Sequence, residues 1–91
     1  MRPPPAISNV GKRADGKEPH ELLSGEYGQW TADSGNWYAR TPDGAHVANL
    51  SGHKVIEHDD GTITVVPSIL CSAGDGHDWH GFLEGGVWRL A

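Results

Sequence analysis

Six histidines and one proline-flanked serine are the residues of this 91-residue chain that could do chemistry. A serine nucleophile needs a neutral histidine within hydrogen-bond reach, a third group to orient that histidine, and donors for the oxyanion. Ser68 follows Pro67, where a bend would project its hydroxyl from a sheet, and His80 follows after a loop that can return the chain alongside. Ser68 and His80 are therefore the candidate nucleophile and base of a serine hydrolase.

The other parts of such a site have several candidates. The orienting group could be His46, Asp60 or Asp78, and the oxyanion donors could be the amides of Gly81 or of Gly85 and Gly86. No string matches the Gly-x-Ser-x-Gly elbow of the α/β-hydrolases. On spacing alone, a serine such as Ser68 is more often a strand-end residue that bonds its own backbone.

Metal binding and thiol chemistry are the alternative uses of these residues. His77 and His80 have a spacing that metal ligands use, and His46, His53 or Asp78 could complete the set. No specific metal signature is present, and we expect neither a metal nor another cofactor. Cys71 is the single cysteine, which excludes an intramolecular disulfide; it is either a nucleophile paired with His77 or His80, or a small buried hydrophobe.

The elements that must position these residues are short β-strands separated by glycine turns. Three hairpins are predicted: 37–41 with 46–50, 54–58 with 62–66, and 81–84 with 87–90. Pro67 should end its strand or lie at a sheet edge, because proline donates no ladder hydrogen bond. Trp79, Phe82 and Trp88 either line a groove or form the core. The fold expected is mainly β, a small antiparallel meander of hairpins forming an open barrel or two layers.

The N-terminal segment differs from the rest in composition. Residues 1–26 are rich in proline and glycine and poor in branched apolar residues, so we expect a flexible arm, with one helical turn within 19–24. Residues 27–91 would form the single β domain. A core this small makes a homodimer through an exposed edge strand a further possibility.

Charge and hydropathy exclude some classes of partner. The net charge of −5 argues against nucleic-acid binding, which requires a basic face. No apolar stretch approaches the length of a membrane span, and the N-terminus lacks the apolar core of a signal peptide. We therefore expect a cytoplasmic protein that contacts neither nucleic acid nor membrane.

A set of motifs resembles a known family. They are Trp37-Tyr38, Thr-Pro-Asp-Gly-Ala-His-Val-Ala-Asn-Leu at 41–50, Glu-His-Asp-Asp-Gly-Thr-Ile-Thr-Val at 57–65, Pro-Ser-Ile-Leu at 67–70, and Trp-His-Gly-Phe-Leu-Glu-Gly-Gly-Val-Trp-Arg at 79–89. Together they resemble a widespread group of small bacterial and phage proteins. Some of these accompany bacterial ubiquitin-like conjugation operons, where the relatives called BubE are understood as serine peptidases acting on the ubiquitin-like protein.

The resemblance implies a Ser/His/His site. Its pattern is a histidine after a glycine-rich turn, a Thr-x-x-Pro-Ser-Ile segment, and a later histidine before an aromatic strand. These map to His46, Ser68 and His80, with Thr64 and Pro67 as framing residues. Many relatives carry cysteines around the first histidine and before the second, and this chain has none there, so any metal held by such cysteines would be absent.

Three hypotheses follow. The first is a minimal serine peptidase in which Ser68 attacks a carbonyl, His80 is base and then acid, and His46 orients or assists; its substrate is a protein or peptide, by resemblance the tail or conjugate of a ubiquitin-like protein. The second is a non-catalytic phage or bacterial accessory protein that binds a host protein through the face from Trp79 to Trp88. The third is a histidine-ligated metal-binding domain.

Overall fold

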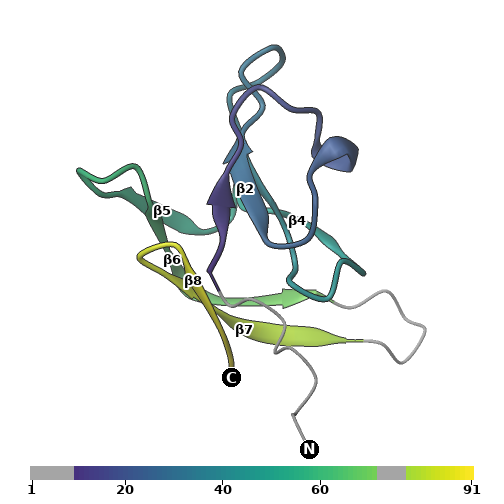
Figure 1. Cartoon of the computed structure of the whole chain (residues 1–91), viewed down its shortest axis with the longest axis vertical. Helices are drawn as coiled ribbons and strands as arrows, with labels where there is room; N and C mark the ends of the chain where they lie inside the picture. Colours follow the sequence, from purple (N-terminus) through teal and green to yellow (C-terminus); the bar gives the residue numbers. More distant parts are fainter. Residues whose placement is uncertain (1–9, 72–77) are drawn as a thin grey trace, which may run out of the picture.

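The computed structural model contains two four-stranded sheets. Figure 1 shows how they are arranged. The structure describes residues 10–71 and 78–91. The first sheet contains β1 (Lys12–Arg13), β2 (Glu26–Gln29), β3 (Trp37–Arg40) and β4 (Val47–Asn49). The second contains β5 (Lys54–Glu57), β6 (Ile63–Cys71), β7 (Trp79–Glu84) and β8 (Val87–Leu90). The expected mainly β fold is confirmed, as two open sheets.

Strand order within each sheet follows the chain. The pairs β2–β3 and β3–β4 are antiparallel, as are β5–β6, β6–β7 and β7–β8, whereas β1 pairs with β2 in parallel. All three predicted hairpins are therefore confirmed. Their turns end on Gly44, Gly61 and Gly86, which have positive φ as the turn geometry requires.

The two sheets share one core. Its fully buried members come from both: Tyr27 and Ala39 from the first sheet, Ile63, Leu83 and Trp88 from the second. The rings of Trp79 and Trp88 meet edge to face with centroids 5.4 Å apart, a favoured aromatic arrangement. These tryptophans therefore belong to the core, and the alternative that they line a groove is not supported.

Residues 10–26 have definite partners in the structure. Val10 forms an isolated antiparallel β-bridge with Val87, the first residue of β8, and the Gly11 amide donates to the Gly86 carbonyl at 2.7 Å. A Cβ on Gly11 would lie 2.9 Å from the Gly25 carbonyl and from the Trp88 and Tyr27 rings, so only glycine fits there. The predicted helical turn is a short 3-10 helix, η1 (Pro19–Glu21). The flexibility expected of residues 1–26 stays a prediction, but residues 10–26 pack on the sheets.

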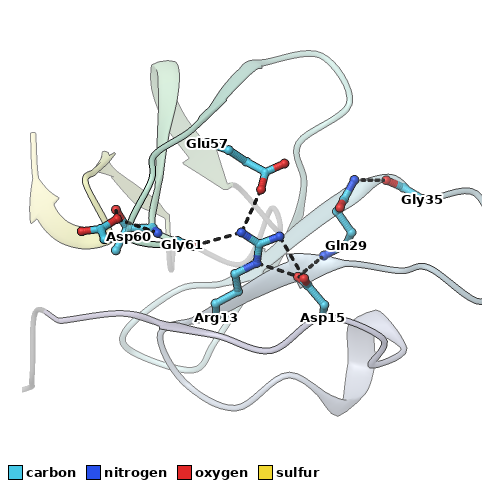
Figure 2. A network of polar contacts seen from close by, with 8 residues as sticks. Arg13, Asp15, Gln29, Gly35, Glu57, Asp60 and Gly61 are labelled. Carbon is cyan, nitrogen blue, oxygen red and sulfur yellow. Dashed lines mark hydrogen bonds and ion pairs between the residues drawn. The ribbon is translucent and has the colours of Figure 1, made fainter.

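One arginine ties the two sheets together (Figure 2). The Arg13 guanidinium on β1 bonds Asp15 beside it, and reaches across to the Glu57 carboxylate at 2.9 Å and the Gly61 carbonyl at 3.1 Å on the hairpin of β5 and β6. It also stacks over the Trp37 ring, 5.0 Å from the centroid. Burial by itself raises the pKa of Asp15, but the hydrogen bonds from Arg13 and the Gln29 amide outweigh it and lower that pKa.

Pro67 lies inside β6, so the first predicted alternative, that it ends its strand, is wrong. The second alternative, a position at a sheet edge, agrees with the absence of a β5 partner beyond Val66. The pairing of β6 with β5 stops at Val66, and its register with β7 shifts between Val65 and Ile69. Neither neighbouring strand therefore needs an N–H from this position, and a bulge is where a sheet tolerates proline. The consequence is that Ser68 sits beside an irregularity of the sheet.

Candidate functional site

Ser68 and His80 meet on the outer face of the second sheet. Leu70 of β6 is the register partner of His80 of β7, so Ser68, two residues earlier, lies diagonal to His80 on the same face. Diagonal neighbours across antiparallel strands are within reach of long side chains. Ser68 Oγ lies 2.8 Å from His80 Nε2. The structure thus brings together the serine and histidine that the sequence predicted.

This geometry suits proton transfer. A hydroxyl and an imidazole nitrogen at 2.8 Å are within the range of about 2.6–3.2 Å expected of a nucleophile and its general base. In the neutral tautomer with an unprotonated Nε2, the serine hydroxyl donates to the ring. His80 is exposed and Ser68 is half-buried, so the pair is reached directly from solvent. The arrangement can activate the hydroxyl as a nucleophile.

His53 is a neighbour of Ser68 that the sequence did not single out for this role. Its Nε2 lies 3.2 Å from the Ser68 carbonyl oxygen, to which it donates. Beyond Val66 that side of β6 no longer has β5 as a ladder partner, so the imidazole takes the place of a strand amide. His53 therefore fixes the peptide group that follows Ser68. In the sequence, only the high number of histidines could have indicated a role for His53.

His46 lies on the wall of a neighbouring cavity. It ends the turn after β3, where its amide donates to the Thr41 hydroxyl at 3.2 Å and its carbonyl accepts from the Thr41 amide at 2.9 Å. Its predicted role as the orienting histidine stays a prediction. The Asp60 carboxylate, another candidate for that role, accepts hydrogen bonds from the Thr62 amide and hydroxyl at the tip of the hairpin of β5 and β6.

The cavity has a volume of about 580 Å³ and lies between β4 and β6. Volumes of this order are typical of small-molecule sites. Its described lining residues are His20, Arg40, Ala45, His46, Val47, Ala48, Asn49, His53, Ile69, Leu70 and Cys71. Ser68 and His80 are not among these lining residues, but His53 bonds the Ser68 carbonyl and Leu70 is the register partner of His80.

Cys71 is poorly suited to nucleophilic chemistry. Burial raises the pKa of its thiol, and the charge of Asp43 acts in the same direction. The thiolate is the reactive form of cysteine, so this environment suppresses reactivity. The observation agrees with a small, partly buried hydrophobe packed against the core.

Two of the predicted oxyanion donors are engaged elsewhere. The Gly85 amide donates to Thr64 Oγ1 at 2.9 Å, and the Gly86 amide donates to the Ile63 carbonyl at 2.9 Å. The prediction that the Gly85 and Gly86 amides serve as oxyanion donors is wrong, because they hold the last hairpin against β6. Gly81 lies in β7 opposite Ile69, where a Cβ would come within 2.5 Å of the Trp79 ring.

The metal reading and the aromatic face have less support. No group of three potential ligands converges among residues 10–71 and 78–91, and His77 lies outside them. Trp79 and Trp88 are 6% and 1% exposed, which leaves the expected aromatic binding face without its tryptophans. The outer face of the second sheet instead presents Phe82, whose ring centroid lies 4.8 Å from the Arg89 guanidinium.

Comparisons with models of protein families, with curated proteins and with solved structures gave no match. In the part of the chain that the structure covers, no helix is long and apolar enough to cross a membrane.

Proposed function

We propose that the protein is a minimal serine hydrolase of the peptidase type, with Ser68 as nucleophile and His80 as general base and then acid. The observation that carries this proposal is the 2.8 Å distance between Ser68 Oγ and His80 Nε2. Two further facts support it. The pair is open to solvent, and the peptide after Ser68 is held by His53.

The proposed reaction runs in two halves. Ser68 Oγ attacks the carbonyl carbon of the substrate while its proton passes to His80 Nε2, forming a tetrahedral intermediate. The intermediate collapses with cleavage of the C–N bond, and His80 returns the proton to the leaving amine. A water molecule then attacks the acyl-serine ester with His80 again as base, which releases the acid and restores the hydroxyl.

The proposed substrate is a peptide segment, and by the sequence resemblance it is the C-terminal tail or a conjugate bond of a ubiquitin-like protein. The surface around Ser68 supports a peptide, because β6 exposes apolar side chains before and after Ser68. Val66 is 45% and Leu70 64% exposed. An extended chain laid across this face would cover both residues and bring a carbonyl group to the serine.

Reaction with a fluorophosphonate tests the nucleophile. Serine attack on phosphorus expels fluoride and leaves a covalent adduct, which intact-mass measurement detects and peptide mapping locates. We expect one adduct on Ser68 in the wild-type protein and none in Ser68→Ala. Ser51→Ala is the matched control, because Ser51 is an exposed serine in the turn before β5.

The decisive negative result is a folded wild-type protein that forms no adduct, or an adduct that persists in Ser68→Ala. Either outcome would sink the hydrolase. The accessory-protein reading would then take its place, with the exposed side chains of Val66 and Leu70 as the surface to test for a host partner.

A further inference from the structure

The backbone of Leu70 in β6 has open hydrogen-bonding groups. Leu70 is the register partner of His80 in β7, and the His80 carbonyl accepts the Ala91 amide on the far side of β7. Opposite residues of an antiparallel pair either bond each other or both direct their groups away. The amide and carbonyl of Leu70 therefore point away from β7, toward the side where β5 has ended, and no backbone group among residues 10–71 and 78–91 pairs with them.

This side of β6 borders the cavity. His53 donates to the carbonyl of Ser68, two residues before Leu70, from the side where β5 has ended. Both His53 and Leu70 line the cavity. Since His53 already bonds the Ser68 carbonyl, the amide and carbonyl of Leu70 are the next groups along β6 that a bound molecule could meet.

The wall of the cavity formed by β4 is also an open strand edge. β4 is the last strand of its sheet and pairs only with β3. The Leu50 amide, just beyond β4, donates to the Trp37 carbonyl. Because the bonding direction alternates along an antiparallel strand, Ala48 bonds β3, whereas Val47 and Asn49 direct their amides and carbonyls outward. Both of these residues line the cavity, and their outward groups have no backbone partner in the described part of the chain.

These two edges lack the charged residues that commonly protect a free strand. β5, an open edge of the second sheet, carries Lys54 and Glu57, whereas β4 and residues 69–71 carry no charged side chain. Proteins blunt exposed edges with charges because a row of unpaired amides and carbonyls recruits another chain. Leu70 is nevertheless 64% exposed. An uncharged edge with an exposed leucine is typical of a strand that receives a partner strand.

We propose that the cavity between β4 and β6 binds an extended peptide segment of another protein through its main chain. Leu70 on β6, together with Val47 and Asn49 on β4, supplies the donors and acceptors for this strand addition. The volume of about 580 Å³ is within the range of occupied ligand sites. Neither Ser68 Oγ nor His80 takes part, so this inference is independent of the proposed hydrolase.

Two capped hexapeptides with the same side chains serve as probes. One is acetyl-Thr-Val-Thr-Val-Thr-Leu-amide, and the other carries N-methyl groups on its four central residues, which removes main-chain donors along both edges of the extended peptide. In NMR titrations we expect the first to give saturable shifts of the amides of Val47, Asn49 and Leu70. The methylated peptide should bind at least about tenfold more weakly, because several hydrogen bonds are lost. No saturable shift with the first peptide, or equal affinity for both, would overturn the proposal.

The free edge of β5 is the matched control. The His58 amide donates to the Thr62 carbonyl, and alternation back along β5 makes the Val55 amide point away from β6. We expect no shift at Val55. Equal shifts at Val55 and Leu70 would mean that the peptide adds to any open edge, and the cavity would then not be a specific site.

Proline at an outward-facing amide tests the site from the protein side. Val47→Pro removes an unpaired donor and leaves the bonds of β4 to β3 in place, so an edge strand tolerates it. We expect at least about fivefold weaker binding of the unmethylated peptide, whereas Val55→Pro, the same change on β5, should keep the wild-type affinity. Unchanged affinity in a folded Val47→Pro protein would contradict the proposal.

Hydrogen exchange of the wild-type protein decides the question even if Val47→Pro does not fold. The Leu70 amide should exchange rapidly in the free protein and become protected in the presence of the unmethylated peptide. Slow exchange of Leu70 in the free protein would mean that an internal partner already fills the site, and the proposal would be wrong.

Discussion

Two histidine–hydroxyl pairs lie on the second sheet, and they differ in what the hydroxyl is doing. Ser68 Oγ lies 2.8 Å from His80 Nε2, and Thr64 Oγ1 lies 2.6 Å from His58 Nε2. Distance alone would nominate both as nucleophile and base. The hydroxyl of Thr64, however, also accepts the Gly85 amide at 2.9 Å, so it joins the two hairpins of the sheet.

The backbone around the two hydroxyls distinguishes the pair proposed as reactive from the structural one. Thr64 lies where β6 is paired in register with β5, opposite Ile56. Ser68 lies in the stretch where the register with β7 shifts and the pairing with β5 has ended. Bulges re-aim side chains at functional sites. A primary hydroxyl at such a position is easier to approach than the branched Thr64 side chain.

Replacing each histidine by alanine should give the largest effect, and it tests whether the two pairs are equivalent. His80→Ala removes the base of Ser68, and general-base catalysis contributes about 10²- to 10⁴-fold in rate. We expect the fluorophosphonate labelling rate to fall by that order, while His58→Ala leaves it almost unchanged. A comparable fall in both variants would mean that the reactive hydroxyl has been assigned to the wrong pair or that neither pair is catalytic.

Gly81 offers the next test, because it follows His80 in β7. A Cβ at Gly81 would meet the Arg89 carbonyl and the Trp79 ring within 2.5 Å, and overpacking of this kind costs about 1–3 kcal/mol. We expect Gly81→Ala to lower the free energy of unfolding by that amount and to slow labelling, since β7 must shift and carry His80 with it. Gly52→Ala is the control, because nothing lies within 4 Å of its added Cβ. Equal stability of the two variants in urea unfolding would refute the argument.

The hairpins and the contact of Ser68 with His80 could be predicted from the sequence, but the role of His53 could not. Gly44 and Gly61 mark turns in any sequence of this kind, and the bend at Pro67 pointed to Ser68. The contact of His53 with the Ser68 carbonyl depends on where the pairing of β5 stops and on a register shift, and both are set by tertiary packing. The same holds for residues 10–26, whose partners are backbone groups distant in the sequence.

Arg13 fixes the hairpin that carries the structural pair, and it should affect stability without affecting labelling. Its bonds to Glu57 and to the Gly61 carbonyl flank His58 on either side in the sequence. Exposed ion pairs contribute about 0–1 kcal/mol each, and a cation–π contact contributes about 0.5–1 kcal/mol. We expect Arg13→Ala to lower the free energy of unfolding by about 1–2 kcal/mol, measured by thermal denaturation. Slower labelling in a fully folded Arg13→Ala protein would mean that the hairpin also serves Ser68.

Thr64→Val should show the opposite behaviour from Ser68→Ala. Valine keeps the shape of the side chain but removes the partner of both His58 and the Gly85 amide, and we expect a loss of about 1 kcal/mol in the free energy of unfolding. Labelling should persist. Ser68→Ala should lose labelling with a smaller change in stability. The comparison fails if Thr64→Val forms no adduct although its melting temperature equals that of the wild-type protein.

The smallest effect concerns acid, and it separates loss of stability through one carboxylate from other causes of lost labelling. Glu26 is 6% exposed, and its Oε1 accepts from Lys17 Nζ and the Leu23 amide, both at 2.8 Å. Burial raises the pKa of Glu26, but these two bonds and the nearby charges outweigh it and lower the pKa below its ordinary value of 4.5. The carboxylate therefore contributes stability that is fully present above about pH 4.5 and is lost as the pH falls through the lower folded value.

Melting temperatures measured across that range should show the contribution directly. We expect the wild-type melting temperature to fall by a few degrees more than that of Glu26→Gln as the pH drops below 4.5. Loss of labelling that sets in above this range would then have a cause other than loss of this carboxylate contact. Identical pH profiles for the two proteins would show that Glu26 does not stabilise the fold through its charge, and acid inactivation would need another explanation.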